Sequence, residues 1–221
     1  MLTTGEGAES MNESQQRRIV VLSGGALLGV WALGALCGNE TDDPAVVRVR
    51  AFYDALLGVM KQAKALGVRG RYAKLAPAIQ ATFDLAAMTR IAVGADWNSL
   101  SSQTQASLVD GFSRMTVATY ASRFDGYAGE QFVVEPAPEN RNTGKIVRTK
   151  LLPSNGEPIT LNYLLRPAGI DDWKIVDVYL TGTISELATR RAEFGAILKS
   201  GGPKALDESL RQQAERLLAG K

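Results

Sequence analysis

Histidine is absent from the 221-residue chain, and cysteine occurs once, as Cys37. A Ser-His-Asp triad needs histidine, a conventional zinc site needs histidine or several cysteines, and a disulfide within one chain needs two cysteines. An enzyme built on this sequence would depend on carboxylate, lysine or tyrosine chemistry. We therefore expect no catalytic residue, no metal site and no cofactor, and we expect the protein not to be an enzyme.

An excess of either charge is also missing. The chain has 25 Lys and Arg residues against 23 Asp and Glu residues, a formal net charge of +2. Nucleic acids normally bind a concentrated basic surface, which this near-balance does not indicate, so we expect no nucleic-acid partner. The length, together with a hydrophobic content of 45%, suits one globular domain with its own core.

A single long hydrophobic run covers residues 19–36, directly after Arg17 and Arg18, and a polar segment follows it. This order of charged, apolar and polar segments is typical of a secretory signal. We therefore predict a leader over residues 1–39 and export of the rest of the chain. Cleavage after Cys37 is one outcome. The run is also long enough to remain as a membrane anchor, and Cys37 itself could carry a lipid.

Helical periodicity marks the first half of the remaining chain, residues 40–221, which we predict to be a single domain. Asp43 and Pro44 suit the cap and the first position of a helix, and Ser101 or Ser102 suits the cap of another. Apolar residues that recur every three or four positions predict helices over residues 44–67, 71–81, 84–94 and 102–124.

The hydrophobic period changes to two after Gly129. Alternating or β-branched composition predicts strands over residues 131–135, 145–152, 158–166 and 173–180. The links between these segments are short and rich in turn-forming residues, so antiparallel neighbours in a meander are expected.

Two helices are predicted after the last strand. Thr183 can cap the first, with Glu186 in the capping-box position and Ile184 on the inner face. The second covers residues 203–218. The predicted fold class is therefore α+β, with N-terminal helices and a C-terminal helix packed on a four-stranded antiparallel meander sheet. Such a sheet, curved over helices rich in Phe, Met and Tyr, can enclose an apolar pocket instead of a solid core.

Two blocks of residues have an order and spacing that resemble a known family. The first comprises Trp173, Lys174, Ile175, Asp177, Gly182, Ser185, Arg190 or Arg191, and Phe194. The second comprises Phe83, Asp84, Gly94, Trp97, Gln105, Phe112, Thr119, Tyr120, Ala121, Phe124 and Tyr127. Together they resemble the toluene-tolerance family of periplasmic lipid carriers, whose best-known branch is the MlaC-type phospholipid carrier. The segments YASRFDGYAGE, LNYLLR and VYLTGTISELATRRAEF look most like its hopanoid-cluster branch, HpnM, and the resemblance covers about residues 44–200.

The resemblance implies a non-enzymatic carrier that moves a hopanoid across the periplasm between the inner and outer membranes. It further implies an inner-membrane lipid-exporting transporter as partner, transient contact with a membrane surface, and a pocket for lipid tails between sheet and helices. The candidate pocket residues are Leu56, Met60, Phe83, Met88, Ile91, Phe112, Met115, Tyr120, Leu161, Tyr163 and Ile175. From spacing alone, ordinary core packing is the stronger interpretation for any one of them.

Two other functions remain open. The ligand could be a two-tailed phospholipid, as in MlaC-type carriers, or the domain could be an uncleaved, membrane-tethered scaffold for a lipid-synthesis or export complex. Asp171 and Asp172 fit a turn, and Asp177 fits local hydrogen bonding, better than a catalytic pair. Arg190 and Arg191 could meet an anionic headgroup or a partner protein, but a solvated helix end is the stronger interpretation.

Overall fold

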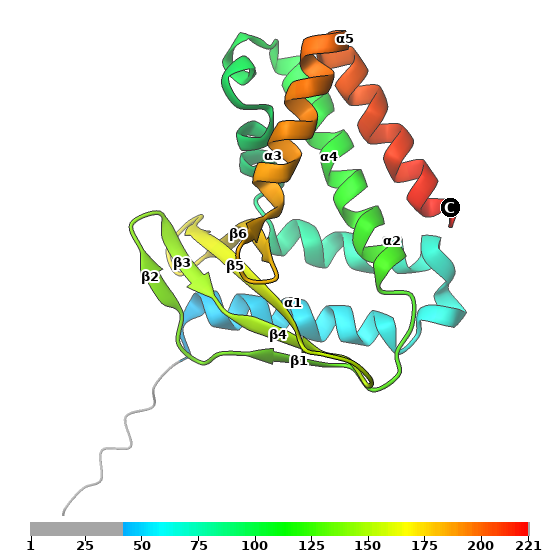
Figure 1. The fold of residues 1–221 in the computed structure, drawn as a ribbon, viewed down its shortest axis with the longest axis vertical. Helices are drawn as coiled ribbons and strands as arrows, with labels where there is room; N and C mark the ends of the chain where they lie inside the picture. The colour runs from blue at the N-terminus through cyan, green and yellow to red at the C-terminus, as the bar shows by residue number, and fades with distance from the viewer. Residues whose placement is uncertain (1–41, 221) are drawn as a thin grey trace, which may run out of the picture. The chain divides into compact units, whose positions relative to one another are not determined.

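The computed structural model describes residues 42–220, so the predicted leader lies outside the described residues. Helices and an antiparallel sheet make up the domain (Figure 1), which confirms the predicted α+β class. The helices are α1 Pro44–Met60, α2 Ala63–Thr82, α3 Leu85–Val93, α4 Ser102–Arg123 and α5 Glu186–Leu218, with a 3₁₀ helix, η1, at Gly94–Ser99. No helix in this part of the chain is both long enough and apolar enough to span a membrane.

Two helices begin at predicted caps, Asp43 and Ser101, and α3 begins at a third cap, Asp84. Asp43 and Asp84 each accept a hydrogen bond of 2.9 Å from a backbone amide of the first turn, and Ser101 accepts one of 3.2 Å. Each bond satisfies an amide that has no partner inside its helix. The predicted helix end at Gly67 is wrong. Helix α1 already ends at Met60, and Gly67, with a φ of 59°, forms a kink inside α2.

The start of α5 also differs from the prediction. Ser185 caps this helix by accepting a hydrogen bond of 2.9 Å from the amide of Ala188, so Thr183 is not the cap. The reason is a short strand, β7 Ile184–Ser185, which pairs with the preceding strand and delays the helix. As a consequence Ile184 is exposed instead of facing inward.

The sheet has seven strands instead of the predicted four. They are β1 Gln131–Val134, β2 Glu139–Arg141, β3 Gly144–Val147, β4 Thr149–Leu152, β5 Ile159–Pro167, β6 Trp173–Leu180 and β7. The predicted strand over residues 145–152 is broken at Arg148, and both halves, β3 and β4, pair with β5. Strand β2 forms inside a predicted turn by pairing with β3. All named strand pairs are antiparallel, as predicted, and β5 also pairs with β6.

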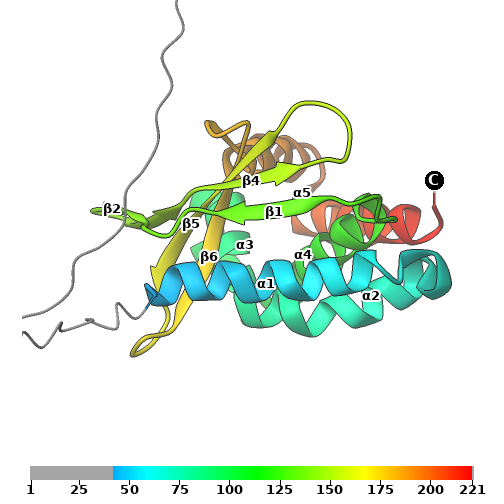
Figure 2. The ribbon, with the colours of Figure 1, turned by 90° about the horizontal axis from the view of Figure 1, so that it is seen from below.

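The helices pack on one face of this sheet. Helix α1 lies along it and contacts β1, β3 and β6, while α4 and α5 pack against each other (Figures 1 and 2). Strand β6 also contacts α2, α3 and α5. The largest fully buried side chains come from both layers, among them Phe52 and Leu56 of α1 and Tyr163, Leu165 and Ile175 of the sheet. The hydrophobic core therefore lies between the sheet and the helices and extends between the helices themselves.

Asp177 joins strand β6 to the start of α5. Its buried carboxylate accepts hydrogen bonds from the Ser185 hydroxyl at 2.6 Å, the Leu187 amide at 3.1 Å and the Val178 amide at 2.8 Å. The Leu187 amide lies in the first turn of α5, where no carbonyl of the helix can reach it. The interpretation of Asp177 as a local hydrogen-bonding residue is confirmed.

Replacing Asp177 with Ala is expected to lower the free energy of unfolding by about 2–4 kcal/mol, because three donors lose a buried acceptor at once. Chemical denaturation followed by circular dichroism measures this change. Asp125, which is exposed between α4 and β1, supplies the control, and Asp125→Ala is expected to change stability by less than about 0.5 kcal/mol. Equal effects of the two substitutions would contradict a structural role for Asp177.

Candidate functional site

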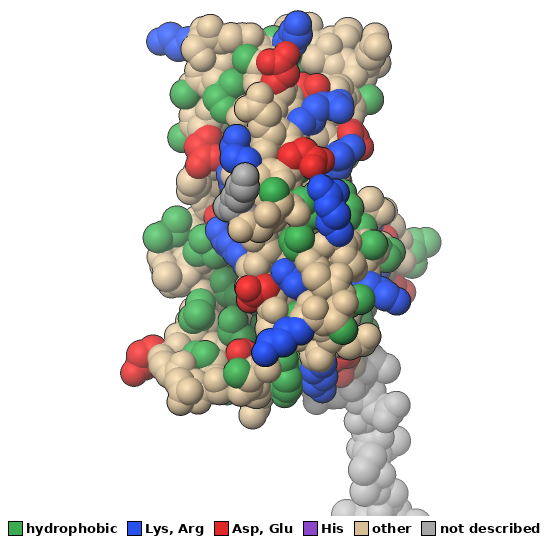
Figure 3. Space-filling model, turned by 90° about the vertical axis from the view of Figure 1, so that its right-hand side faces the viewer, with side chains coloured by type: hydrophobic (Ala, Val, Ile, Leu, Met, Phe, Trp, Pro, Cys, Tyr) green, Lys and Arg blue, Asp and Glu red, His purple; other side chains and the backbone are tan. Residues whose placement is uncertain are grey.

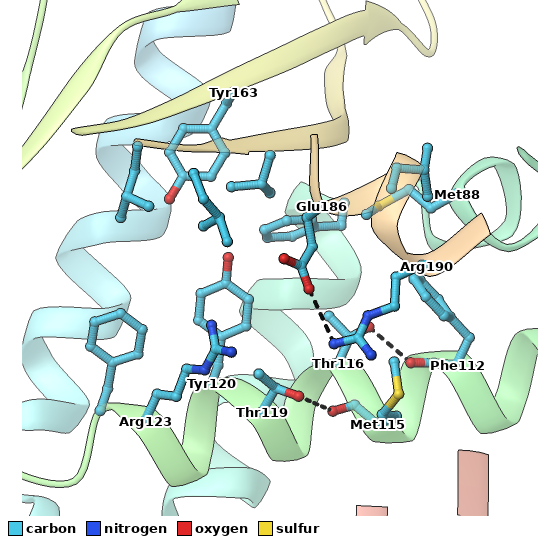
Figure 4. Close-up of a pocket in the computed structure, with 16 residues that line it drawn as sticks. Met88, Phe112, Met115, Thr116, Thr119, Tyr120, Arg123, Tyr163, Glu186 and Arg190 are labelled. Atoms are coloured by element: carbon cyan, nitrogen blue, oxygen red, sulfur yellow. Dashed lines mark hydrogen bonds and ion pairs between the residues drawn. The ribbon is translucent and has the colours of Figure 1, made fainter. Parts of the chain in front are cut away.

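A cavity lies between strands β5 and β6 on one side and helices α3, α4 and α5 on the other (Figure 4). It contains about 820 Å³ of space between atoms, counted to its open mouth, and the centre of a water molecule can occupy about 130 Å³ of it. Its walls are mostly aliphatic, aromatic and methionine side chains. The larger figure includes solvent at the mouth, so the enclosed free space is narrow.

Seven of the eleven candidate pocket residues line this cavity. They are Phe83, Met88, Phe112, Met115, Tyr120, Leu161 and Tyr163. The other four lie outside its lining, because Leu56, Met60 and Ile175 are buried in the core and Ile91 packs, half-buried, against it. The cavity therefore occupies one end of the predicted apolar interior, and contact of any of these residues with a lipid stays a prediction.

Nine lining residues were not among the candidates. They are Thr116, Thr119, Arg123, Phe124, Val178, Leu180, Glu186, Leu187 and Arg190. Thr116, Thr119 and Arg123 continue the helical face of Phe112, so the three-to-four spacing along α4 could have found them. The two threonine hydroxyls donate to carbonyl oxygens four residues earlier, at 2.8 and 2.9 Å, and so need no partner in the cavity.

Buried hydroxyl groups lie at the inner side of the cavity. The Tyr53 hydroxyl is hydrogen-bonded to the Tyr163 hydroxyl at 3.0 Å and to the Thr149 hydroxyl at 2.6 Å, and Thr149 donates to the Leu161 carbonyl. Burial raises the pKa of Tyr53 to about 12, and it raises the pKa values of Tyr163 and Tyr120 well above 10. These phenols are therefore neutral at physiological pH, and this part of the cavity carries no charge.

Charged side chains occur at a different part of the cavity wall. Arg190 forms an ion pair with Glu186 at 3.1 Å (Figure 4). It forms a second ion pair with Glu193 at 2.9 Å. Arg123, at the end of α4, forms no ion pair with any other residue between 42 and 220. It lies beside Tyr120 with its guanidinium at the cavity (Figure 4). The lining thus carries one cation without a protein counter-charge.

The residues that line the cavity suit binding of an apolar group with an anionic end. One carboxylate, Glu186, is present, and it is paired with Arg190. Within the described part of the chain, no three acidic, His or Cys side chains lie close enough to hold a metal ion. Apolar walls with a few placed polar groups are the usual composition of ligand pockets.

The fold is an α+β domain in which an apolar cavity lies between the helices and an antiparallel sheet. The MlaC protein family matches residues 50–212, most of the chain, so the chain belongs to the MlaC family. One similar solved structure is a phospholipid-binding protein from Ralstonia solanacearum in complex with a phospholipid. It shares 23% identity, with a TM-score of 0.67, over 80% of this chain and 99% of that chain. Among curated protein sequences, none matches.

The predicted family is therefore confirmed, whereas the hopanoid-cluster branch is not and stays a prediction. At 23% identity the Ralstonia protein supports the fold, and its bound phospholipid is a property of that protein.

The raised pKa of Tyr53, about 12, predicts a loss of stability in alkali. Between about pH 10 and 12 the folded protein keeps a phenolic proton that the unfolded chain has released, so the stabilisation is complete below pH 10 and is lost as the pH rises. A shift of about two pKa units corresponds to about 2.7 kcal/mol over this window. We expect the free energy of unfolding of the wild type to fall more steeply above pH 10 than that of Tyr53→Phe.

Denaturation at a series of pH values tests this expectation. The control is Tyr127→Phe, because the Tyr127 side chain is 43% exposed, and its slope should match that of the wild type. A Tyr53→Phe slope equal to that of the wild type would show that burial does not perturb Tyr53.

Proposed function

We propose that this protein is a lipid carrier that encloses the apolar part of one lipid in the cavity between β5, β6 and helices α3, α4 and α5. The observation that carries the proposal is the cavity itself, which is lined by hydrophobic side chains and ends beside an unpaired arginine. Membership of the MlaC family and the phospholipid bound to the similar Ralstonia protein support it.

The physical task of such a carrier is to replace water around hydrocarbon. Each methylene that leaves water gains about 0.8 kcal/mol, so a free lipid rarely leaves a bilayer. A cavity with walls of Phe, Met, Leu and Val side chains offers a similar environment. Methionines at positions 88 and 115 suit this task because their flexible thioethers adapt to ligands of irregular shape.

We infer that the ligand is a phospholipid. Arg123 lines the cavity and has no acidic partner among the described residues, and a lipid phosphate would supply the missing charge. The hopanoid predicted from the sequence is the rival ligand. It would fill the same apolar walls but would leave Arg123 without a counter-charge, so the electrostatics favour the phospholipid.

The remaining parts of this proposal concern the cellular setting. Export to the periplasm rests on the predicted leader over residues 1–39, and an inner-membrane lipid-exporting transporter as partner rests on the family. A membrane-tethered scaffold is the alternative from another class of protein. A scaffold would have an interior filled by its own side chains, and the free space between α4 and β5 counts against it.

Purification of the exported protein without detergent, from cells that make both phospholipids and hopanoids, followed by native and denaturing mass spectrometry, tests the function. We expect one diacyl phospholipid for each chain. A bound hopanoid would keep the carrier function and change the ligand. A folded protein that stays empty, even after incubation with vesicles, would contradict the proposal and favour the scaffold.

A matched pair of variants links the bound lipid to this cavity. Thr119 and Thr189 both lie in helices, and each hydroxyl donates to the carbonyl four residues earlier, but Thr119 lines the cavity and Thr189 is exposed. The indole of Thr119→Trp should fill the narrow free space and reduce the bound lipid at least about tenfold, because even one unaccommodated methylene pair costs about 1.6 kcal/mol. Thr189→Trp should retain the lipid content of the wild type.

The charge of Arg123 predicts a preference for anionic headgroups. Arg123→Gln is expected to weaken binding of an anionic phospholipid by about fivefold, as is typical of one solvent-exposed charge pair, while binding of an uncharged lipid with the same tails stays unchanged. Competition between the two lipids, scored by native mass spectrometry at low salt, measures the preference.

Arg114→Gln provides the control for this prediction. Arg114 lies on the same helix but pairs with Glu215 of α5, at 3.4 Å, and does not line the cavity. If both arginine variants shift the competition equally, net charge explains the preference and Arg123 has no specific contact with the headgroup.

A further inference from the structure

Two half-exposed isoleucines extend one wall of the cavity to the surface. Ile159, at the start of β5, is 45% exposed, and Ile184, in β7, is 55% exposed. Large hydrophobic side chains at this level of exposure are uncommon in the described domain. Both residues project from the same face of the sheet, as the strand register shows.

The strand register places Ile184 on the face of the sheet that forms the cavity wall. Leu161 pairs with Leu180, and Leu180 pairs with Ile184. Directly paired residues of antiparallel strands project from the same face. Since Leu161 and Leu180 both line the cavity, Ile184 continues that row beyond the cavity edge.

Ile159 belongs to the neighbouring row of the same face. It precedes Leu161 by two positions in β5, and successive residues of a strand alternate between faces. Ile159 pairs with Leu151, which pairs in turn with Phe132 of β1. The Phe132 ring lies 6.2 Å from that of Phe124, a residue of the cavity lining. An apolar surface therefore runs from the inside of the cavity to the outside of the protein without a polar break in these rows.

A positive charge lies in the cavity lining from which this rim extends. Arg123 lies next to Phe124 in the cavity lining and has no ion-pair partner among residues 42–220. On the face drawn in Figure 3, exposed hydrophobic side chains are interspersed with both basic and acidic side chains. An apolar surface that leads to a cation matches the boundary of a bilayer, where hydrocarbon lies beneath phosphate.

We infer that the rim formed by Ile159 and Ile184 is the surface by which the protein docks on a lipid bilayer. This inference rests on the proposed function, because the docked rim would join the cavity wall to the hydrocarbon of the membrane. A lipid tail then moves along Leu161 and Leu180 into the cavity without crossing water. Contact of this surface with a partner protein is the other outcome of the test.

The test compares isoleucine-to-aspartate changes at three exposed positions. Ile159→Asp and Ile184→Asp, separately and combined, place a charge on the rim. Ile170→Asp is the matched control, because Ile170 is 98% exposed in the turn between β5 and β6, after the end of β5 opposite to Ile159. Each protein is sedimented with phospholipid vesicles that contain an anionic phospholipid. Each substitution on the rim removes a large apolar group from the contact, so we expect the double variant to bind vesicles at least about tenfold more weakly than the wild type. Ile170→Asp should bind as the wild type does.

Two further measurements separate this inference from the proposed function. Neither rim residue lines the cavity, so the lipid content of the double variant by mass spectrometry should equal that of the wild type, while lipid transfer between two vesicle populations should slow. The neutral variant Ile184→Ser should show a smaller loss of vesicle binding than Ile184→Asp. Thermal unfolding of all variants checks that each remains folded.

The possible results are distinct. If the double variant sediments with vesicles as well as the wild type, or if Ile170→Asp loses as much binding, the rim is not a membrane surface and a partner protein becomes its occupant. A wild type that sediments through the rim but never carries lipid would overturn the proposed function and leave the docking surface in place.

Discussion

The buried carboxylate of Asp177 is the interaction on which the shape of the cavity depends. From the middle of strand β6 it accepts hydrogen bonds from the Ser185 hydroxyl and the Leu187 amide at the start of α5, and a third from the amide of Val178 in its own strand. The strand and the helix each contribute a residue to the cavity lining near this point, Leu180 and Leu187. A buried, fully hydrogen-bonded carboxylate fixes geometry strongly, because any movement would leave desolvated donors without an acceptor. The opening between sheet and helices is therefore a built feature of the fold.

The opposite side of the interior is closed by aromatic packing. Phe52 of α1 packs edge-on against Phe83 and Tyr120 with ring centroids 5.3 and 5.4 Å apart, and Tyr53 stacks on Phe132 at 4.3 Å. The hydroxyl groups within this cluster bond to one another and to the sheet, so they do not need water. The protein can thus keep a solid core under α1 and an open cavity under α4 within a single hydrophobic interior.

Sequence patterns predicted most of the elements because each depends on local chemistry. Strand β6 has the predicted limits, Trp173 and Leu180, since turn residues bound it on both sides. The predicted start of α5 was wrong because Thr183 and Ser185 are both acceptable helix caps. Only the pairing of β7 with β6, a tertiary contact, selects Ser185. The break of a predicted strand at Arg148 has the same origin, because β3 and β4 pair separately with β5.

The site was predictable in part for a similar reason. Helical spacing shows which face of a helix is buried, but it does not show whether that face meets a core or a cavity. Leu56 and Met115 therefore look alike in the sequence, although Leu56 packs in the core and Met115 lines the cavity. Thr119 and Arg123 occupy the same face of α4 as Met115. They were missing from the predicted pocket residues because only apolar and aromatic residues were considered.

Photo-crosslinking with a phospholipid that carries a diazirine near the end of one acyl chain tests the central claim most directly. Lipid tails held in the cavity should label the inner face of α4 around Met115 and Thr119, and mass spectrometry of peptides would locate the adducts. Labelling of α1 around Leu56 and Met60, or the absence of labelling in a folded protein that is saturated with the lipid, would contradict the assignment of the cavity as the lipid site.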